Sequence, residues 1–227
     1  MFIGCCVMMG YAQVRQRVIL IGDGGEQSPE QRIAIREAAN KVLVGKTTVL
    51  FLGDNVYPRG MGLEGSEQEN EGQEILQSQY KPMREKGAAV YFIPGNHDWD
   101  NSGPAGLEKI EAQSRYLESQ HDSLLHPSPA QGCPDPYEIS FADSIAIIAM
   151  DTEWWLYPFE KANPKADCSC KTKDDVIASL DELIYKNRFK TILFATHHPF
   201  KSYGHHGGYF NLRDHLFPLT VANDNLL

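Results

Sequence analysis

Four apolar runs in this sequence each end on a side chain that can bind a metal ion. These side chains are Asp23 after the run at 17–22, Asp54 after 48–52, Asn96 after 88–94 and His197 after 191–196. Carboxylate, carboxamide and imidazole groups together favour hard or borderline metals such as iron, manganese and zinc, and a carboxylate can bridge two ions. Four unrelated turns of this composition would be an improbable coincidence, so we interpret the four side chains as one metal site.

Two further reactive groups stand directly behind these positions. Tyr57 offers a phenol three residues after Asp54, and His97 follows Asn96. The imidazole of His97 can move protons, and the adjacent Asp98 is expected to hold its tautomer. Each short motif taken alone is also ordinary turn chemistry. The prediction therefore depends on the motifs occurring together.

The apolar runs have the length and composition of buried parallel strands, and such strands carry their chemistry at their carboxyl ends. Ser28, Pro29 and Glu30 mark the start of a helix that we expect to reach about residue 44. This strand-helix-strand unit would place Asp23 and Asp54 on neighbouring parallel strands. We expect His197 to join the same sheet edge. Two carboxylates at that edge would repel each other unless a cation lay between them.

The remaining pattern predicts an α/β fold with few ambiguous segments. Further helices are expected at 73–86, 104–121, 174–186 and 211–219, and a pair of antiparallel strands at 137–141 and 144–150. The segment 59–72 is interpreted as a solvated loop, and 153–174 as an irregular aromatic insertion that forms either a pocket wall or a surface lobe. His121 and His126 are expected to be solvated, and Asp151 to cap a helix.

Composition limits the class of partner. The 227 residues carry 21 basic and 30 acidic side chains, a formal net charge of −9. Without a basic cluster, this balance argues against binding to a nucleic-acid scaffold, and it is neutral about small anionic substrates. Bound metal ions would supply positive charge that the formal count omits.

The first twelve residues are apolar and uncharged, and Gly10-Tyr11-Ala12 has the shape of a signal-peptide cleavage site. We therefore interpret 1–12 as a signal-peptide remnant, too short to span a membrane, and expect a secreted or periplasmic protein. The alternative is a short N-terminal strand in a cytoplasmic protein. In an oxidising compartment Cys133 is expected to pair with Cys168 or with Cys170.

The sequence resembles the calcineurin-like metallophosphoesterases, and within them the purple acid phosphatase branch. The resemblance rests on the segments at 23–25 (Asp-Gly-Gly), 53–57 (Gly-Asp-Asn-Val-Tyr), 95–98 (Gly-Asn-His-Asp) and 195–199 (Ala-Thr-His-His-Pro). The general family opens with Asp-x-His, whereas this chain has Asp-x-Gly and supplies Tyr57 instead. That exchange marks the purple branch.

The resemblance implies a fold of central mixed β-sheets flanked by helices in α/β/β/α layers. It also implies two metal ions, Fe(III) with Fe(II), Zn or Mn. The first ion would be held by Asp23, Asp54 and Tyr57, and the second by Asp54, Asn96 and His197, with Asp54 as the bridge. A phenolate ligand favours the ferric ion because a hard trivalent cation stabilises a phenolate whose free pKa is about 10.

By the same resemblance, a metal-bound hydroxide would hydrolyse a phosphate monoester. His97 and His206 would orient the phosphate and protonate the leaving alkoxide. The expected substrate is a phosphorylated small molecule or a phosphopeptide, with inorganic phosphate as a product. A phosphodiesterase or nucleotidase on the same scaffold is the alternative, with the segment 154–170 as a pocket wall.

One motif of the family, Gly-His-x-His, is absent from this chain. By resemblance, its two histidines would each complete one metal site and would follow further strands. We therefore expect 13–227 to be a metallophosphoesterase catalytic domain that is incomplete at its C-terminus and has weak activity or none. A third hypothesis follows, in which an inactive truncated domain acts as a binding module.

Overall fold

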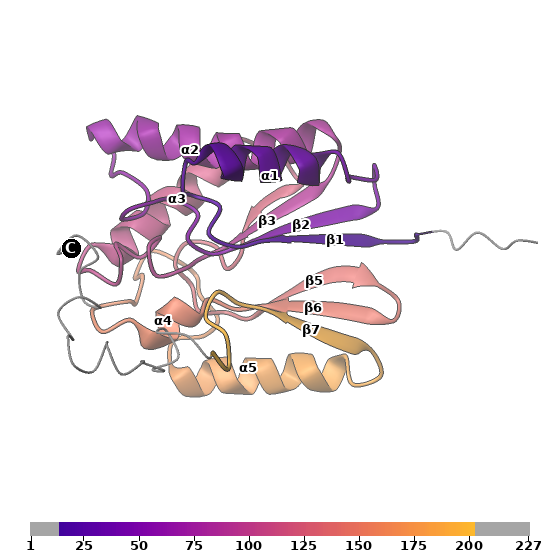
Figure 1. The fold of residues 1–227 in the computed structure, drawn as a ribbon. Coiled ribbons are helices and arrows are strands. Elements are labelled where there is room, and N and C mark those ends of the chain that lie inside the picture. The colour runs from indigo at the N-terminus through magenta and orange to yellow at the C-terminus, as the bar shows by residue number, and fades with distance from the viewer. Residues whose placement is uncertain (1–13, 203–227) are drawn as a thin grey trace, which may run out of the picture. The chain divides into compact units, whose positions relative to one another are not determined.

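The computed structural model describes residues 14–202 (Figure 1). The predicted signal segment at 1–12 and the predicted helix at 211–219 lie outside the described residues. The chain divides after His197 into two compact units, and all helices and strands described below belong to the first.

The first sheet is parallel and has the strand order β1 (Arg17–Ile21), β2 (Thr47–Leu52), β3 (Ala89–Ile93) and β4 (Leu125–Pro127). The register pairs Ile21 with Phe51 and Phe51 with Phe92. Asp23 and Asp54 therefore follow neighbouring parallel strands, which confirms that prediction. The strand β4 was not predicted, and the ring of His126 within it stacks on Tyr91 with centroids 4.6 Å apart, so the prediction of a solvated His126 is wrong.

Three helices cover one face of this sheet: α1 (Pro29–Ala39), α2 (Glu67–Glu85) and α3 (Gly106–Ser119) (Figure 1). The hydroxyl of Ser28 accepts a hydrogen bond from Gln31 N at 3.0 Å, so α1 begins where the sequence predicted, although it ends earlier. The helix α2 begins before the predicted residue 73. The first turns of α2 carry acidic residues on their exposed side, and the residue that they bury against Met61 is Gly72. They therefore lack the regular spacing of apolar residues by which a helix is predicted.

The second sheet is mixed, with β5 (Tyr137–Ala142) antiparallel to β6 (Ile145–Ala149) and β6 parallel to β7 (Thr191–Ala195). The predicted antiparallel pair is confirmed. The helix α5 (Lys173–Lys186) covers this sheet and starts with a capping box between Thr172 and Asp175. Because β7 pairs with β6, His197 follows a strand of the second sheet, and the prediction of one common sheet edge is wrong.

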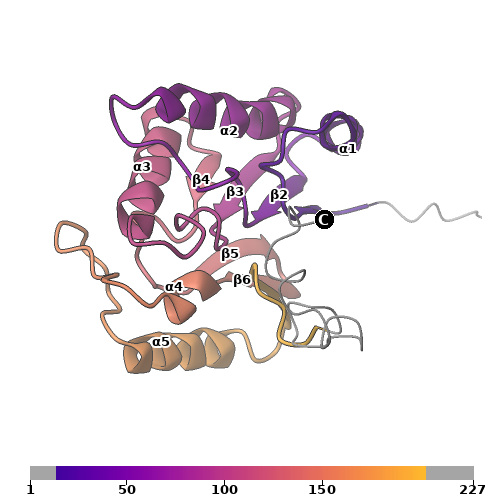
Figure 2. The same ribbon diagram turned by 60° about the vertical axis from the view of Figure 1, so that its left-hand side comes forward.

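The two sheets face each other across an apolar layer, which gives the predicted α/β/β/α order (Figures 1 and 2). This layer is formed by buried aliphatic side chains from both sheets, including Leu50, Ile93, Ile139, Ile147 and Ala195. The packing brings the end of β7 next to the ends of β2 and β3. Within residues 14–202, no helix has the length and apolarity that crossing a membrane requires.

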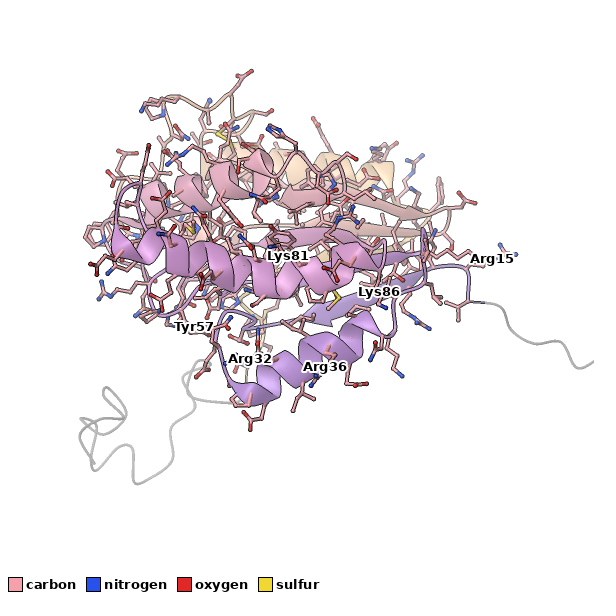
Figure 3. The ribbon with its side chains drawn as sticks, turned by 90° about the horizontal axis from the view of Figure 1, so that it is seen from above. Arg15, Arg32, Arg36, Tyr57, Lys81 and Lys86 are labelled. Atoms are coloured by element: carbon pink, nitrogen blue, oxygen red, sulfur yellow. A yellow bond between two sulfur atoms is a disulfide. The ribbon has the colours of Figure 1, made fainter. Side chains whose placement is uncertain are left out.

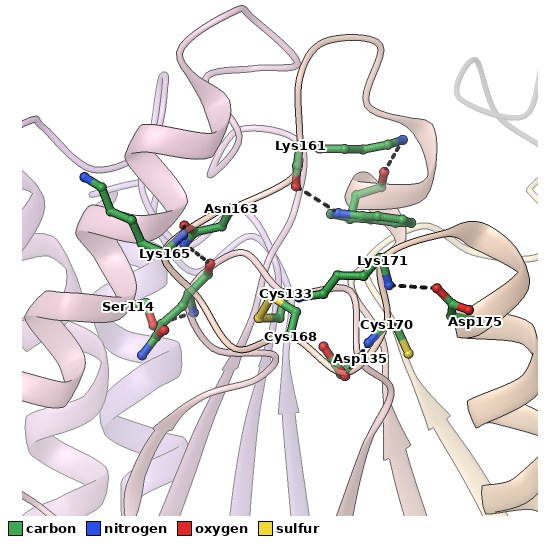
Figure 4. The surroundings of a disulfide bond; sticks show 12 residues. Ser114, Cys133, Asp135, Lys161, Asn163, Lys165, Cys168, Cys170, Lys171 and Asp175 are labelled. Carbon is green, nitrogen blue, oxygen red and sulfur yellow. Dashed lines mark hydrogen bonds between the residues drawn. A yellow bond between two sulfur atoms is a disulfide. The ribbon is translucent and has the colours of Figure 1, made fainter.

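The predicted irregular insertion contains one short helix, α4 (Thr152–Leu156), and a disulfide between Cys133 and Cys168 (Figure 4). The carboxylate of Asp151 accepts a hydrogen bond from Trp154 N at 3.0 Å, which confirms its prediction as a cap. Cys170 is buried as a free thiol, and burial raises its pKa. Of the two pairings left open by the sequence, the structure has Cys133 with Cys168.

We expect the double variant Cys133→Ser/Cys168→Ser to lower the free energy of unfolding by roughly 3 to 5 kcal/mol. The two cysteines are 35 residues apart, so the bond removes substantial entropy from the unfolded chain. Urea denaturation followed by tryptophan fluorescence measures the change. The wild-type protein treated with reductant is the control and should fall to the stability of the variant. Equal midpoints for the oxidised wild type and the variant would contradict the expectation.

Candidate metal centre

The loops after β1 and β2 hold their aspartates in a left-handed backbone conformation. The φ angles are 52° at Asp23 and 54° at Asp54. Such angles are uncommon for residues other than glycine and concentrate at functional sites. Two backbone hydrogen bonds join the loops, from Asp23 N to Gly53 O at 3.2 Å and from Gly25 N to Asp54 O at 3.0 Å. The aspartates therefore project from one connected piece of backbone.

Two glycines allow the loops from both sheets to touch at this point. A Cβ atom on Gly53 would lie 2.5 Å from Nδ1 of His197, and one on Gly95 would lie 2.4 Å from Oδ1 of Asp54. Neither distance is compatible with a real side chain. Gly53 also has a φ of 90°, which disfavours any other residue. The close approach of Asp54 and His197 thus depends on glycine at both positions.

Asp98 links the loops after β2 and β3 through hydrogen bonds to the backbone of both. Its fully buried carboxylate accepts hydrogen bonds from Asn55 N at 2.9 Å, Val56 N at 3.1 Å, Gly95 N at 2.8 Å and Asn55 Nδ2 at 3.0 Å. Burial raises the pKa of Asp98 to about 8, against the effect of these donors. The prediction that Asp98 orients His97 is wrong, because the carboxylate is committed to the backbone of the two loops.

The first group of candidate ligands consists of Asp23, Asp54 and Tyr57. The hydroxyl oxygen of Tyr57 lies 3.1 Å from Oδ1 of Asp23 and 2.9 Å from Oδ2 of Asp54. A phenol has one proton and can donate to only one of these carboxylates. Burial and then the charge of Asp54 raise the pKa of Tyr57 well above its ordinary value. Three oxygen atoms thus converge with a single proton among them, an arrangement that a cation would stabilise.

In the view of Figure 3, Tyr57 lies at the Arg32 end of α1, away from Lys86.

The second group consists of Asp54, Asn96 and His197. Nδ1 of His197 lies 2.8 Å from the carbonyl oxygen of Leu52, so this nitrogen must carry a proton and donate it. In a neutral ring Nε2 is then an acceptor, yet it lies 3.2 Å from Oδ1 of Asn96 and 3.4 Å from Oδ1 of Asp54. Nε2 and the two oxygen atoms are all potential ligands of one cation. A backbone carbonyl that fixes the tautomer is the usual partner of a metal-binding histidine.

Asp54 belongs to both groups through different oxygen atoms. Its Oδ2 faces Tyr57, and its Oδ1 faces His197. The carboxylate is 4% exposed. Ligand atoms of Asp23, Asp54 and His197 lie within 4.8 Å of one another. The donor set of carboxylates, phenol, amide oxygen and imidazole therefore fits two hard or borderline ions bridged by Asp54. A second group in the described part of the chain, at Cys133, Asp135 and Cys168, has both sulfur atoms in the disulfide.

His97 lies at the edge of this cluster. Its ring packs against Tyr57 with centroids 4.3 Å apart, and its Nε2 lies 3.9 Å from Oδ2 of Asp54. Nδ1 lies 2.6 Å from the carbonyl oxygen of Pro58, which fixes the proton on Nδ1. The structure thus brings together Asp23, Asp54, Tyr57, Asn96, His97 and His197. The remaining predicted site residue, His206, lies outside the described residues.

Sequence reasoning missed the groups that orient these side chains. The carbonyl oxygens of Leu52 and Pro58 set the tautomers of His197 and His97, and a backbone carbonyl has no sequence signature. It also missed Glu153, whose carboxylate is 2% exposed and accepts a hydrogen bond from Ser102 at 2.8 Å. Glu153 stands two residues after the capping Asp151, a position at which an acidic residue is usually exposed, so the sequence did not indicate that it is buried.

Comparison with known proteins agrees with this chemistry. The profile of the calcineurin-like phosphoesterase family matches residues 16–222. No curated protein matches the chain. Among solved structures, a protein of unknown function from Aquifex aeolicus matches with 15% sequence identity over 77% of this chain and 75% of that one. The TM-score of this match is 0.34.

Proposed function

Because the chain belongs to the calcineurin-like phosphoesterase family, whose members are metal-dependent hydrolases of phosphoesters, we propose that it hydrolyses phosphate monoesters at a dinuclear site of the purple acid phosphatase type. The observation that carries the proposal is the position of Asp54. Its Oδ2 lies 2.9 Å from the phenol oxygen of Tyr57, and its Oδ1 lies 3.4 Å from Nε2 of His197. A bridging carboxylate of this kind is what a pair of ions requires.

The two ligand groups differ in chemistry. Asp23, Asp54 and Tyr57 offer only oxygen, which suits Fe(III), whereas Asp54, Asn96 and His197 include a nitrogen, which suits Fe(II), Zn or Mn. When bound, the two ions would lower the pKa of a water molecule and neutralise the charge on the phosphoryl oxygens. The phenol of Tyr57 would lose its proton on binding Fe(III), although burial and then its carboxylate neighbours raise its pKa.

His97 is placed to exchange a proton with the substrate. Its Nδ1 donates to Pro58 O, so Nε2 is the nitrogen that gains or loses a proton. When protonated, Nε2 can donate to a phosphoryl oxygen and then to the leaving alkoxide. His206 is proposed to act beside it, as the family resemblance implies.

Hydrolysis of p-nitrophenyl phosphate and of bis-p-nitrophenyl phosphate by the metal-loaded protein tests the proposal. We expect the monoester to be the better substrate, by at least about a hundredfold in kcat/KM, which corresponds to a difference of about 2.7 kcal/mol in transition-state binding. A preference for the bis ester would replace the monoesterase proposal with a phosphodiesterase. Inactivity on both esters with two ions bound would remove the hydrolase proposal.

Tyr57→Phe should abolish the visible absorption band of the iron-loaded protein. The band arises from charge transfer between a tyrosinate and Fe(III), and Tyr57 is the phenol that contacts both Asp23 and Asp54. Visible spectroscopy of the protein loaded with iron makes the measurement. Tyr137→Phe, at an exposed tyrosine in β5, is the control and should keep the band. A band that persists in Tyr57→Phe would show that this ligand is wrongly assigned.

We further propose a secreted or periplasmic location. The Cys133–Cys168 disulfide supports it, because disulfides persist in oxidising compartments and are rare in the cytoplasm. Fractionation of cells that express the intact gene tests the location. Recovery of the protein in the cytoplasmic fraction, with Cys133 and Cys168 reduced, would refute it.

A further inference from the structure

Three consecutive residues close to the metal centre adopt left-handed backbone angles. The φ values are 61° at Asp100, 53° at Asn101 and 57° at Ser102. Residues other than glycine visit this region singly, at a cost of roughly 1–2 kcal/mol each. A run of three must therefore be held in place by its surroundings. We call Asp100–Asn101–Ser102 the left-handed segment.

Both ends of the left-handed segment are anchored. The carboxylate of Asp100 is 7% exposed and lies 3.0 Å from Nζ of Lys109 in α3. At the other end, the hydroxyl of Ser102 donates to the buried carboxylate of Glu153 at 2.8 Å. The anchors come from α3 and α4, so two separate helices hold the segment next to the metal centre.

Between these anchors the segment folds back onto the loop that carries Asn96. Asn101 N donates to His97 O at 3.3 Å, and Ser102 N donates to Asn96 O at 3.1 Å. The side chains also meet, because Nδ2 of Asn96 donates to Oδ1 of Asn101 at 3.2 Å. The left-handed backbone therefore directs the side-chain oxygen of Asn101 at the side-chain amide of Asn96.

This contact matches the orientation in which the oxygen of the Asn96 carboxamide faces the cluster. With Nδ2 directed at Asn101, Oδ1 lies 3.2 Å from Nε2 of His197. A rotation of the amide by half a turn would direct Nδ2 at Nε2 of His197, which is an acceptor in the neutral ring. That orientation would be favourable in the metal-free protein, but it would direct two N–H groups at a cation. Some other contact must therefore keep the oxygen turned inwards.

We infer that Asn101 is a positioning residue that holds the carboxamide oxygen of Asn96 in the orientation needed to bind the second metal ion. The inference rests on the proposed metal site, because it takes Asn96 as a ligand. It also explains the strained backbone, since the left-handed angles bring the acceptor within 3.2 Å of Nδ2.

Two variants at position 101 separate the hydrogen bond from the backbone strain. Asn101→Gly accepts the left-handed angle easily but removes the acceptor, whereas Asn101→Asp tolerates the angle and keeps an acceptor. In calorimetric titrations with Mn²⁺, Asn101→Gly should weaken the second binding step by about tenfold to a hundredfold, the usual effect of losing a group that orients a ligand. Asn101→Asp should bind Mn²⁺ at least as tightly as the wild type.

Thermal melting of the metal-free proteins serves as the control for folding. Because glycine relieves strain, Asn101→Gly should melt no lower than Asn101→Asp, so its loss of affinity would not reflect unfolding. The inference is overturned if Asn101→Gly binds both ions with wild-type affinity, or if Asn101→Asp is weakened as much as Asn101→Gly.

The variant Asn96→Ala distinguishes this inference from the proposed function. If Asn96→Ala loses one ion while Asn101→Gly keeps both, the metal site stands and only the role of Asn101 fails. If Asn96→Ala also keeps both ions at wild-type affinity, the assignment of Asn96 as a ligand fails, and the inference about Asn101 fails with it.

Discussion

Asp54→Asn is expected to remove both metal ions together and to lower kcat/KM for p-nitrophenyl phosphate by about ten-thousandfold, or about 5.5 kcal/mol. The substitution keeps the shape of the side chain. It replaces one of the two oxygen atoms that face Tyr57 and His197, and it removes the negative charge. Two divalent ions about 4 Å apart repel each other by roughly 16 kcal/mol at an effective dielectric constant near 20, so the anionic bridge is essential.

Metal analysis of the purified variant gives the direct measurement, as ions bound per chain after loading and dialysis. Asp23→Asn is the matched control, because Asp23 contacts Tyr57 but belongs to only one ligand group. It should keep the ion held by Asp54, Asn96 and His197. Two tightly bound ions in Asp54→Asn would contradict the bridging role, whatever the activity of the variant.

Asp98→Ala is expected to lower the free energy of unfolding by about 3 to 5 kcal/mol, because several buried N–H groups would lose their acceptor. The carboxylate is the common acceptor for donors on Asn55, Val56 and Gly95. Alanine would leave these donors buried and unsatisfied, at a cost of about 1 to 3 kcal/mol each before relaxation. The loops that carry Asp54 and Asn96 would separate as a consequence.

Urea denaturation monitored by circular dichroism measures this loss. Asp143→Ala removes a carboxylate from the exposed turn between β5 and β6 and is the matched control, with little expected change. Asp98→Asn should fall between the wild type and Asp98→Ala, because its amide nitrogen would face N–H donors. A variant Asp98→Ala that unfolds at the wild-type urea concentration would show that the two loops hold together without the carboxylate.

Several features of this protein were predictable because they depend on neighbours in sequence. Ser28 before Pro29 determines where α1 begins, since the cap and the proline act within one turn. The apolar runs before Asp23 and Asp54 predicted parallel neighbours, because a strand followed by a helix and a second strand has few ways to pack. The candidate ligands were visible for the same reason, as polar residues that end apolar runs.

Other features were decided only by the packing of distant segments. The strand β7 pairs with β6 rather than with the first sheet, so His197 reaches Asp54 across the layer between the sheets. The spacing of the cysteines in the sequence allowed Cys133 to pair with Cys168 or with Cys170. The path of the chain through the insertion places Cys168 next to Cys133.

The sequence by itself determined which side chains are available for metal binding and the local elements that present them, because residue type and short-range periodicity carry that information. The tertiary structure decided how those side chains are used. Asp98 follows His97 in the chain but supports the backbone of two loops, and carbonyl oxygens orient both imidazoles instead. Asn101 contacts Asn96 only because three residues adopt left-handed angles. The positions of backbone acceptors and the left-handed angles arise from contacts between distant parts of the chain, and for that reason no local sequence pattern predicts them.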